Sequence, residues 1–288
     1  FFDDSEPLYG RNTGKLELAP FETRVLKEIL ADFRKRYTKD DLLDLWTITG
    51  GVARYVELLM ESGATTRLKM IDTVFGGITS FIDEGRTILS EEFGKDYGTY
   101  YTILASIAAG RTSYAEISNE VGMDVGGYLT RLENQFSLIS KKQPVYEKTT
   151  TKNCLYQIDD CFFRFWFRFV VGYQDLIELG RLDELKEIVS RDLDVFSGYA
   201  LERYFYQKFK EETSYAKMGG WWDRKGENEI DLVCSALASD VIDFYEIKRN
   251  RKRIDLRKLE EKSVAFFAKN PELKRCHATF KALSLEDM

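Results

Sequence analysis

The chain has 288 residues, enough for about two domains, and its hydrophobic content of 44% and aromatic content of 14% exclude a disordered chain. A net charge of −6 excludes a protein coated with phosphate-binding surface, and no apolar run approaches the roughly 18 residues that span a bilayer. The four cysteines are scattered without a CxxC pair, which indicates reduced thiols in a cytoplasmic protein and neither a zinc site nor a disulfide framework.

The charge is unevenly distributed along the chain. Residues 1–197 contain 24 Lys and Arg against 32 Asp and Glu, a net charge of −8. Residues 198–288 contain 18 against 16, a net charge of +2. The last third is therefore the part whose local charge suits a nucleic acid.

Residues 1–93 predict a bundle of small helices. A short strand is expected to run into a helix that begins near Pro20, because the apolar residues from Phe21 to Phe33 recur at helical spacing. A second helix is expected over residues 39–46, and a third after the glycine pair 50–51.

Residues 94–158 predict a winged helix-turn-helix. Ser113 and Glu116 have the spacing of a capping box, in which hydroxyl and carboxylate satisfy each other's backbone donors at a helix start. Asp124 is expected to cap the following helix, and residues 141–153 to form a polar wing. The expected elements are three helices over 99–109, 114–121 and 125–134, and two strands over 136–140 and 154–158.

Residues 159–197 contain the most apolar segment of the chain, 162–171. This segment is too short and too charged to cross a membrane. We predict buried helices that connect two domains, in preference to a role in stacking a ligand.

Residues 198–288 predict an α/β layer, because strands alternate with helices. The pair Trp221 and Trp222 is expected to divide between core and edge, with base stacking as the alternative. The expected elements are a helix over 198–212, strands over 215–223, 229–234 and 241–248, a helix over 255–268 and a strand over 276–283.

Two of these strands contain the residues that indicate chemistry. The period of two in a strand places Ile230 and Leu232 on one face and Asp231 on the other, and it places Glu246 and Lys248 on a shared face. The short connection favours an antiparallel hairpin, which can bring Asp231 beside Glu246. Two such carboxylates repel unless a cation lies between them, and hard oxygen ligands select Mg²⁺ or Mn²⁺.

A metal ion held by Asp231 and Glu246 can polarise a phosphate and lower the pKa of a bound water. Lys248 can orient that water or stabilise the charge that develops on phosphorus oxygens. Glu202, on the preceding helix, is a fourth candidate catalytic residue and a further metal ligand. The Glu-x-Lys motif alone is weak, because it occurs four times in the chain, and a surface hairpin with a Glu–Lys pair remains the alternative.

Five of the six residues from Lys248 to Arg253 are basic, so this segment can meet a phosphate backbone. The expected recognition helix, by contrast, has Arg131 as its only basic residue, which favours packing over direct base reading. The candidate nucleic-acid contacts are Arg249, Arg251, Lys252 and Arg253 beyond the motif, with Lys141 and Lys142 in the wing.

The chain resembles known families in two respects. Residues 198–288 resemble PD-(D/E)XK nucleases, in the segments 226–233 and 245–248. Nearly the whole chain is similar to the C-terminal part of archaeal-type ATPases of the signal-transducing STAND class, which end in an endonuclease-like domain of unknown function, DUF234. The segments that carry this second resemblance are 8–11, 49–55, 158–170 and the nuclease-like stretch.

This resemblance implies an ATPase whose nucleotide-binding core precedes residue 1, with ATP as its cofactor in the intact parent. It implies that Arg11 and Arg54 sense the nucleotide. Segment 10–16 is not a Walker A motif, because three residues separate its glycines and leucine follows its lysine, so the fragment alone is not expected to hydrolyse ATP. Ala53 stands where the family's lid motif has proline. The implied domains are an ATPase tail and helical lid (1–93), a winged helix (94–158), connecting helices (159–197) and a nuclease-like domain (198–288).

The expected function is Mg²⁺- or Mn²⁺-dependent hydrolysis of DNA phosphodiesters, gated by nucleotide state in the parent protein. One alternative is a catalytically silent nuclease-like and winged-helix module that contacts protein or DNA under ATPase control. Another is a nucleic-acid-binding regulator without chemistry. DNA is the expected partner, a membrane is not, and a homo-oligomer is left open.

Overall fold

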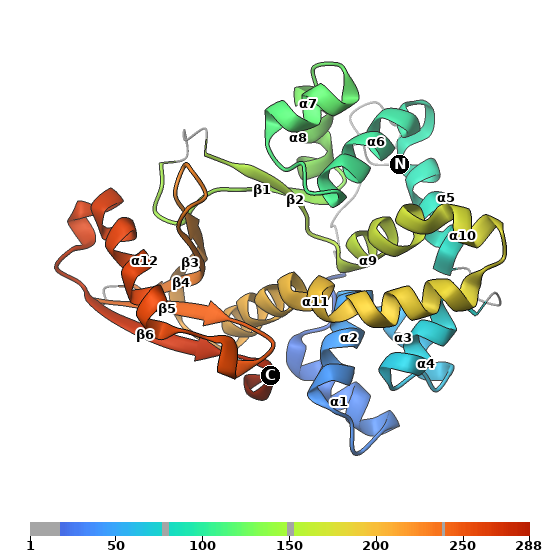
Figure 1. The fold of residues 1–288 in the computed structure, drawn as a ribbon, viewed down its shortest axis with the longest axis horizontal. Helices are drawn as coiled ribbons and strands as arrows, with labels where there is room; N and C mark the ends of the chain where they lie inside the picture. Colours follow the sequence, from blue (N-terminus) through green and yellow to red (C-terminus); the bar gives the residue numbers. More distant parts are fainter. Residues whose placement is uncertain (1–17, 77–80, 149–152, 238–239) are drawn as a thin grey trace, which may run out of the picture.

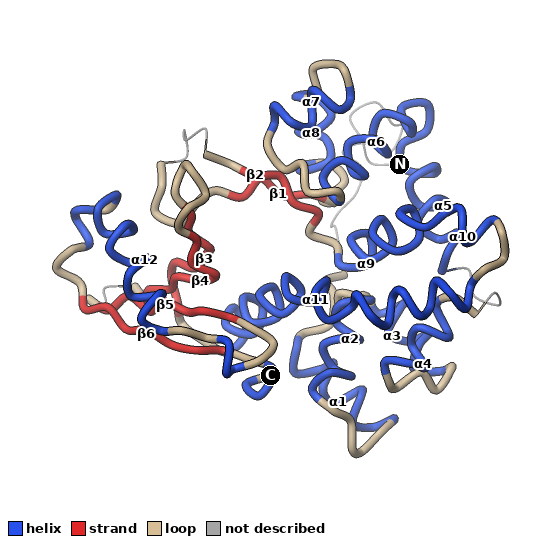
Figure 2. Tube along the Cα trace, viewed as in Figure 1, coloured by secondary structure: helices blue, strands red, loops and turns tan. Residues whose placement is uncertain are grey.

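The protein is described from a computed structural model that covers residues 18–76, 81–148, 153–237 and 240–288. It is a mixed α and β structure with a two-stranded and a four-stranded sheet. Figures 1 and 2 show most helices on one side of the molecule, the larger sheet on the other, and helix α11 (Leu182–Glu212) between them. Across the described ranges, none of the helices combines the length and apolar character that a membrane crossing requires.

Helices are present over the predicted N-terminal segments, and the strand predicted before Pro20 lies outside the described residues. Helix α2 is buried from Asp41 to Thr49 because it packs between its neighbours and α11. The indole Nε1 of Trp46 donates a hydrogen bond to the carbonyl oxygen of Ala200 at 3.0 Å, which ties α2 to α11. The helices of this part are α1 (Thr23–Phe33), α2 (Lys39–Thr49), α3 (Ala53–Glu61), α4 (Arg67–Val74) and α5 (Phe81–Phe93).

Three helices and a hairpin follow in the predicted order. The capping box of Ser113 and Glu116 forms as predicted. The prediction that Asp124 is the next N-cap is wrong by one residue. Val125 takes the cap position, because the Asp124 carboxylate accepts the N–H of Gly126 at 2.8 Å in a local turn. The elements are α6 (Tyr97–Ala108), α7 (Tyr114–Val121), α8 (Gly126–Asn134), β1 (Ile139–Lys142) and β2 (Leu155–Ile158).

The aromatic segment is buried, as predicted, in α9 (Cys161–Phe165) and the π-helical turn η2 (Trp166–Val170), and α10 (Gln174–Glu178) follows. The next helix was predicted to begin at Gly198, and this is wrong. Helix α11 begins at Leu182 and continues for 31 residues across the predicted domain boundary. No proline interrupts it, and its buried residues keep helical spacing on both sides of the boundary.

The larger sheet has the strand order β3-β4-β5-β6. β3–β4 and β4–β5 are antiparallel, whereas β5 and β6 are parallel because α12 crosses between them. Phe266 of α12 packs against Phe244 on one face, and Phe209 of α11 packs against Tyr245 on the other. The elements are β3 (Tyr215–Trp222), β4 (Glu229–Ala236), β5 (Val241–Ile247), α12 (Leu256–Lys269) and β6 (His277–Leu283).

Residues 143–147, which leave β1 in the predicted wing, lie against the larger sheet. We call this segment the strap. The amide of Val145 donates to the carbonyl oxygen of Gly220 at 2.9 Å, and the hydroxyls of Tyr146 and Ser235 are 2.5 Å apart. Val145 is buried with Trp221 in the core beneath α12. The strap therefore joins the hairpin to the sheet, as Figure 1 shows for the β1–β2 ribbon.

Gly85 of α5 packs tightly against Trp166. A Cβ at Gly85 would lie 2.4 Å from the Trp166 ring, so we expect Gly85→Ala to reduce the free energy of unfolding by about 1–3 kcal/mol. Gly198→Ala is the control, because a Cβ there meets no atom within 4 Å and alanine inside a helix adds about 0.5–1 kcal/mol. Urea unfolding measures both changes, and an unchanged Gly85→Ala variant would contradict this packing.

Candidate active site

Three side chains from the end of the β4–β5 pair come together. Leu232 pairs with Tyr245, so one step further along the strands Asp231 lies opposite Glu246. Lys248 Nζ is 3.0 Å from Asp231 Oδ2 and 3.1 Å from Glu246 Oε1. A single ammonium group therefore lies between two carboxylates from neighbouring strands.

A β-bulge on β4 sets the direction of Asp231. Gly219 pairs with Val233 and Trp221 with Ile230, so β4 has one more residue than β3 in this interval. Bulges of this kind re-aim side chains. The Asp231 carboxylate accepts the backbone N–H of Ile247 at 2.7 Å, which fixes it at the end of the strand pair.

The bulge also corrects one prediction. Ile230 and Leu232 were expected on the same face of the sheet. Ile230 instead packs into the core cluster beneath α12, whereas Leu232 packs into the large cluster that includes α11. A simple period of two fails here because the extra residue lies between them.

The charges of this cluster balance one another. A second ammonium group, Lys262 of α12, lies 3.2 Å from Glu246 Oε2. Burial raises the pKa of Asp231, although Lys248 opposes this shift. Burial by itself lowers the pKa of Lys248, but the charges of Asp231 and Glu246 outweigh it, so the Lys248 pKa is raised. Lys248 is thus held in its charged form.

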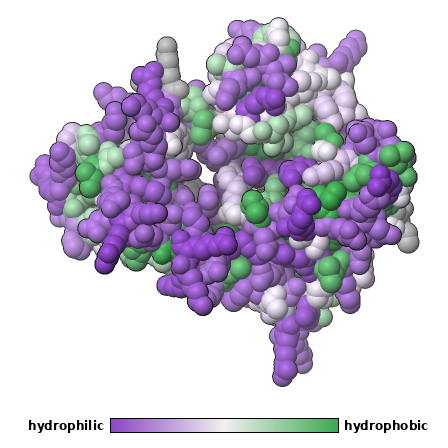
Figure 3. Space-filling model, viewed as in Figure 1, coloured by the Kyte–Doolittle hydropathy of each residue, from purple (hydrophilic) through white to green (hydrophobic). Residues whose placement is uncertain are grey.

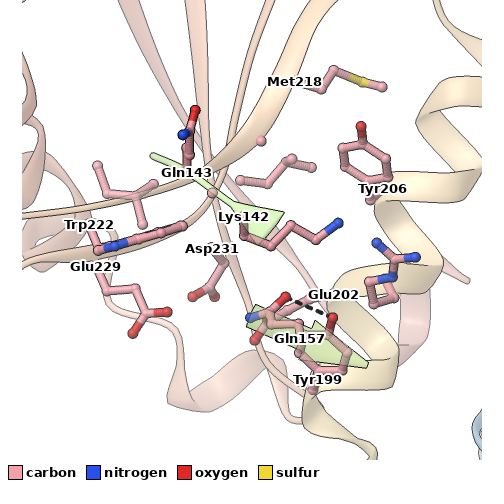
Figure 4. A pocket seen from close by; sticks show the side chains of 15 residues that line it. Lys142, Gln143, Gln157, Tyr199, Glu202, Tyr206, Met218, Trp222, Glu229 and Asp231 are labelled. Atoms are coloured by element: carbon pink, nitrogen blue, oxygen red, sulfur yellow. Dashed lines mark hydrogen bonds between the residues drawn. The ribbon is translucent and has the colours of Figure 1, made fainter. Parts of the chain in front are cut away.

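Glu202 of α11 faces the same cavity as Asp231 (Figure 4). Burial and the negative charge of Asp231 raise the pKa of Glu202 to about 8, against the opposing effect of Lys248. At neutral pH this carboxyl is therefore mostly protonated. It gains its charge only when the pH rises or a further cation arrives.

Asp231, Glu202 and Lys248 border two hollows. A cavity of about 200 Å³ lies between α11, the β1–β2 hairpin and strands β3 and β4, and Asp231 lies in its wall. Figure 3 shows the molecule hollowed near its centre, between this hairpin and α11. A wider groove of about 930 Å³ contains Lys248. Tyr199 and Glu202 line both hollows and so stand at their junction.

Oxygen donors for a metal ion are present around Lys248. Within the described residues, no three His, Cys, Asp or Glu side chains form a ready metal site. Asp231 and Glu246 contact the ammonium of Lys248 in the position that a cation would take between them. Carboxylates are the ligands that Mg²⁺ and Mn²⁺ prefer. Asp231 and Glu246 could hold such an ion if Lys248 moved aside, whereas Glu202, which faces the cavity from α11, does not complete a three-carboxylate group with them here.

The basic residues after Lys248 differ in their surroundings. Arg249 is mostly buried and is neutralised within the chain, by Asp194 at 2.9 Å and by Asp40. Arg251 pairs with Asp287 at 2.9 Å. The exposed basic residues of this segment are Arg251, Lys252 and Arg253.

The predicted contacts on the hairpin point in different directions. Lys141 is exposed, whereas Lys142 lines the cavity and lies 3.3 Å from Asp159. Of the predicted nucleotide-sensing residues, Arg54 is exposed and pairs with Glu84 at 3.1 Å. Arg11 lies outside the described residues.

Sequence reasoning missed several residues of the cavity wall. Glu229 precedes Asp231 by two positions, so the strand period could have identified it. Lys262 gave no such signal, because its contact with Glu246 depends on how α12 packs on the sheet. Arg203 follows Glu202 directly in α11. It also lines the cavity because of the way α11 packs beside it.

Comparison with known proteins identifies similar sequences of unknown function. Residues 166–264 match the model of a family described as archaea bacterial proteins of unknown function, DUF234. The matched segment contains Glu202, Asp231, Glu246 and Lys248. The chain is also 28% identical, over 267 residues, to an uncharacterized protein of Methanocaldococcus jannaschii. This alignment covers 88% of the chain but only 57% of that relative. No solved structure matches the chain.

The raised pKa of Glu202 predicts a pH dependence of stability. Its folded value of about 8 exceeds the ordinary value of 4.5, so the folded state binds the proton more tightly. Stability should therefore fall as the pH rises from 4.5 to 8, by at most about 1.4 kcal/mol per pH unit from this group.

We expect Glu202→Gln to remove this contribution and to gain stability over the wild type as the pH rises through that window. Denaturant unfolding at a series of pH values measures the difference. Glu187→Gln, at an exposed position of the same helix, is the control. A Glu202→Gln curve parallel to that of the wild type would contradict the raised pKa.

Proposed function

We propose that residues 198–288 form a PD-(D/E)XK-type domain that hydrolyses phosphodiester bonds in DNA with Mg²⁺ or Mn²⁺. The observation that carries the proposal is the meeting of Asp231 and Glu246 on Lys248, with Glu202 at the edge of the same cavity. Hydrolysis of a phosphodiester needs charge stabilisation and a positioned water, and these residue types supply both.

Each side chain has a distinct role in this proposal. Asp231 and Glu246 would hold the divalent ion, and Glu202 would add a further carboxylate once it has lost its proton. The ion, when bound, lowers the pKa of a coordinated water and polarises the phosphate. Lys248, released from one carboxylate, orients the water or stabilises the charge that develops on the phosphate oxygens. The raised pKa of Lys248 keeps it charged for this role.

The open groove supplies a path for the nucleic-acid backbone. Lys248 and Arg253 line it, beside the exposed Lys252. Arg251 can exchange its exposed ion pair with Asp287 for a phosphate, because exposed ion pairs contribute little. Arg249 has a structural role here, because its ion pairs join the sheet to α2 and α11.

We also propose that the chain is the C-terminal part of a STAND-class ATPase. The alignment covers only 57% of the archaeal relative, which supports a longer parent protein. In this assignment α1 to α5 belong to the ATPase tail and lid, and α6 to α8 with the β1–β2 hairpin form the winged helix. ATP is then a ligand of the intact parent, and Arg54 responds to it by exchanging its pair with Glu84.

A catalytically silent module is the second candidate. Two observations favour it: Lys248 already neutralises the carboxylates, and the strap is docked on the sheet. In this case the hairpin transmits the state of the ATPase to the sheet, and the surface contacts protein or DNA without chemistry. Metal binding separates the two candidates, because an interaction platform has no need of it.

Manganese binding should depend on pH in a specific way. Because Glu202 must lose its proton, we expect the Mn²⁺ affinity to rise by up to about tenfold per pH unit below pH 8. Titration calorimetry measures this, with Asp231→Asn expected to abolish binding and Glu202→Gln to flatten the pH dependence. Glu261→Gln, exposed on α12, is the matched control. Absence of Mn²⁺ binding at every pH would favour the silent module.

Cleavage of DNA tests the chemistry directly. With Mg²⁺ or Mn²⁺ we expect Lys248→Ala to lower the cleavage rate by about 10²–10³-fold, because charge stabilisation at the phosphate is lost. Lys258→Ala, at an exposed position of α12, should leave the rate unchanged. Equal cleavage by the wild type and Lys248→Ala would contradict the assigned role, and a cleavage-inactive wild type would favour the silent module.

A further inference from the structure

The strap borders the cavity beside Asp231 through Gln143. The backbone bond from Val145 to Gly220 and the hydroxyl pair of Tyr146 and Ser235 fasten the strap to β3 and β4. Lys217 Nζ lies 4.2 Å from the centre of the Tyr146 ring, a cation–π contact. These contacts hold the β1–β2 hairpin in place opposite α11, so the cavity has a defined size.

The cavity wall has the groups that recognise a nucleobase. Trp222 and Tyr206 present aromatic rings, and Gln143 and Gln157 present amide groups (Figure 4). The indole Nε1 of Trp222 donates to Asn153 at 3.1 Å, which fixes the orientation of its ring. Aromatic rings stack on bases regardless of sequence, and amides bond to base edges.

The cavity wall contains two cationic side chains. Lys142 and Arg203 both lie 3.3 Å from Asp159 Oδ1. Glu133 adds an attraction for Lys142, so Lys142 and Arg203 are the cationic groups of this cavity that an anion can meet. Burial lowers the pKa of Lys142, although Asp159 opposes this shift, and an additional anion would favour the charged lysine.

We infer that this cavity takes an unpaired nucleotide, with its base against Trp222 and a phosphate near Lys142 and Arg203. This inference rests on the proposed function, because it names the substrate class of the same site. A volume of about 200 Å³ lies below the roughly 300–1,000 Å³ of drug-sized ligand sites, so it admits one base and not a stacked duplex. A base inside a duplex reaches such a pocket only after it leaves the stack.

The wider groove continues the path that a nucleic-acid strand would follow from the cavity. Tyr199 and Glu202 separate it from the cavity, and Lys248 and Arg253 lie along it. A single strand can place one base in the cavity while its neighbouring phosphates follow the groove. The phosphate between the two hollows then lies beside Glu202 and Asp231, where the proposed hydrolysis takes place.

Binding without metal tests this inference separately from catalysis. Three probes are used, in EDTA at low salt. They are a fluorescent single-stranded thymidine oligonucleotide of about 12 nucleotides, the duplex of that strand with a complementary adenosine oligonucleotide, and free thymidine monophosphate. We expect the single strand to bind at least about tenfold more tightly than the duplex. Trp222→Ala should weaken single-strand binding by about 5–150-fold, the range for loss of one base stack.

Two control variants distinguish a loss of binding from a folding defect. Trp222→Phe keeps an aromatic ring and should retain most of the affinity. Lys142→Gln should weaken binding, whereas Lys95→Gln, at an exposed position between α5 and α6, should not. Competition by thymidine monophosphate would show that the cavity accepts free nucleotides, and oligonucleotide binding without such competition would show that the groove contributes; both outcomes support the inference.

Equal binding of duplex and single strand, or unchanged binding by both Trp222→Ala and Lys142→Gln, would overturn the inference. The failure of the proposed function looks different. Single-strand preference that depends on Trp222, without cleavage in Mn²⁺, would remove the nuclease and leave the binding site. Cleavage of DNA without that preference would remove the binding inference and leave the nuclease.

Discussion

Two carboxylates from neighbouring strands, Asp231 and Glu246, would repel each other at the end of the sheet without the ammonium of Lys248 between them. The antiparallel register of β4 and β5 and the bulge on β4 create this arrangement. Helix α12 adds Lys262 from one face of the sheet. In the proposed function a divalent cation would take the place of this ammonium group, because both would compete for the same carboxylate oxygens.

Helix α11 connects the N-terminal helices to the site around Asp231. It packs on the N-terminal helices, for example where Trp46 bonds to Ala200, and its last turns also pack on the sheet through Phe209, so Glu202 reaches the cavity from a rigid element. The β1–β2 hairpin lies on the opposite side of the cavity from α11. The backbone bond from Val145 to Gly220 attaches it to the sheet. A shift of the hairpin relative to α11 would change the cavity, which would give the proposed ATPase a physical route to the proposed site.

The local features of the fold could be predicted from the sequence, and the long-range contacts could not. The strand period placed Glu246 beside Lys248, and the capping box at Ser113 marked a helix start, because both depend on residues close in the chain. The continuity of α11 was missed, since nothing at Gly198 signals that the helix continues from Leu182. The strap, the neutralisation of Arg249 and the position of Lys262 depend on packing between elements far apart in sequence.

The most direct test of this account is the anomalous diffraction of crystals soaked in Mn²⁺ above pH 8, where Glu202 has lost its proton. We predict a manganese peak between Asp231 and Glu246, at the roughly 2.0–2.2 Å typical of small divalent ions and carboxylate oxygens, with Lys248 displaced from at least one of them. Soaked crystals in which Lys248 still contacts both carboxylates, with no anomalous peak beside them, would contradict the central claim.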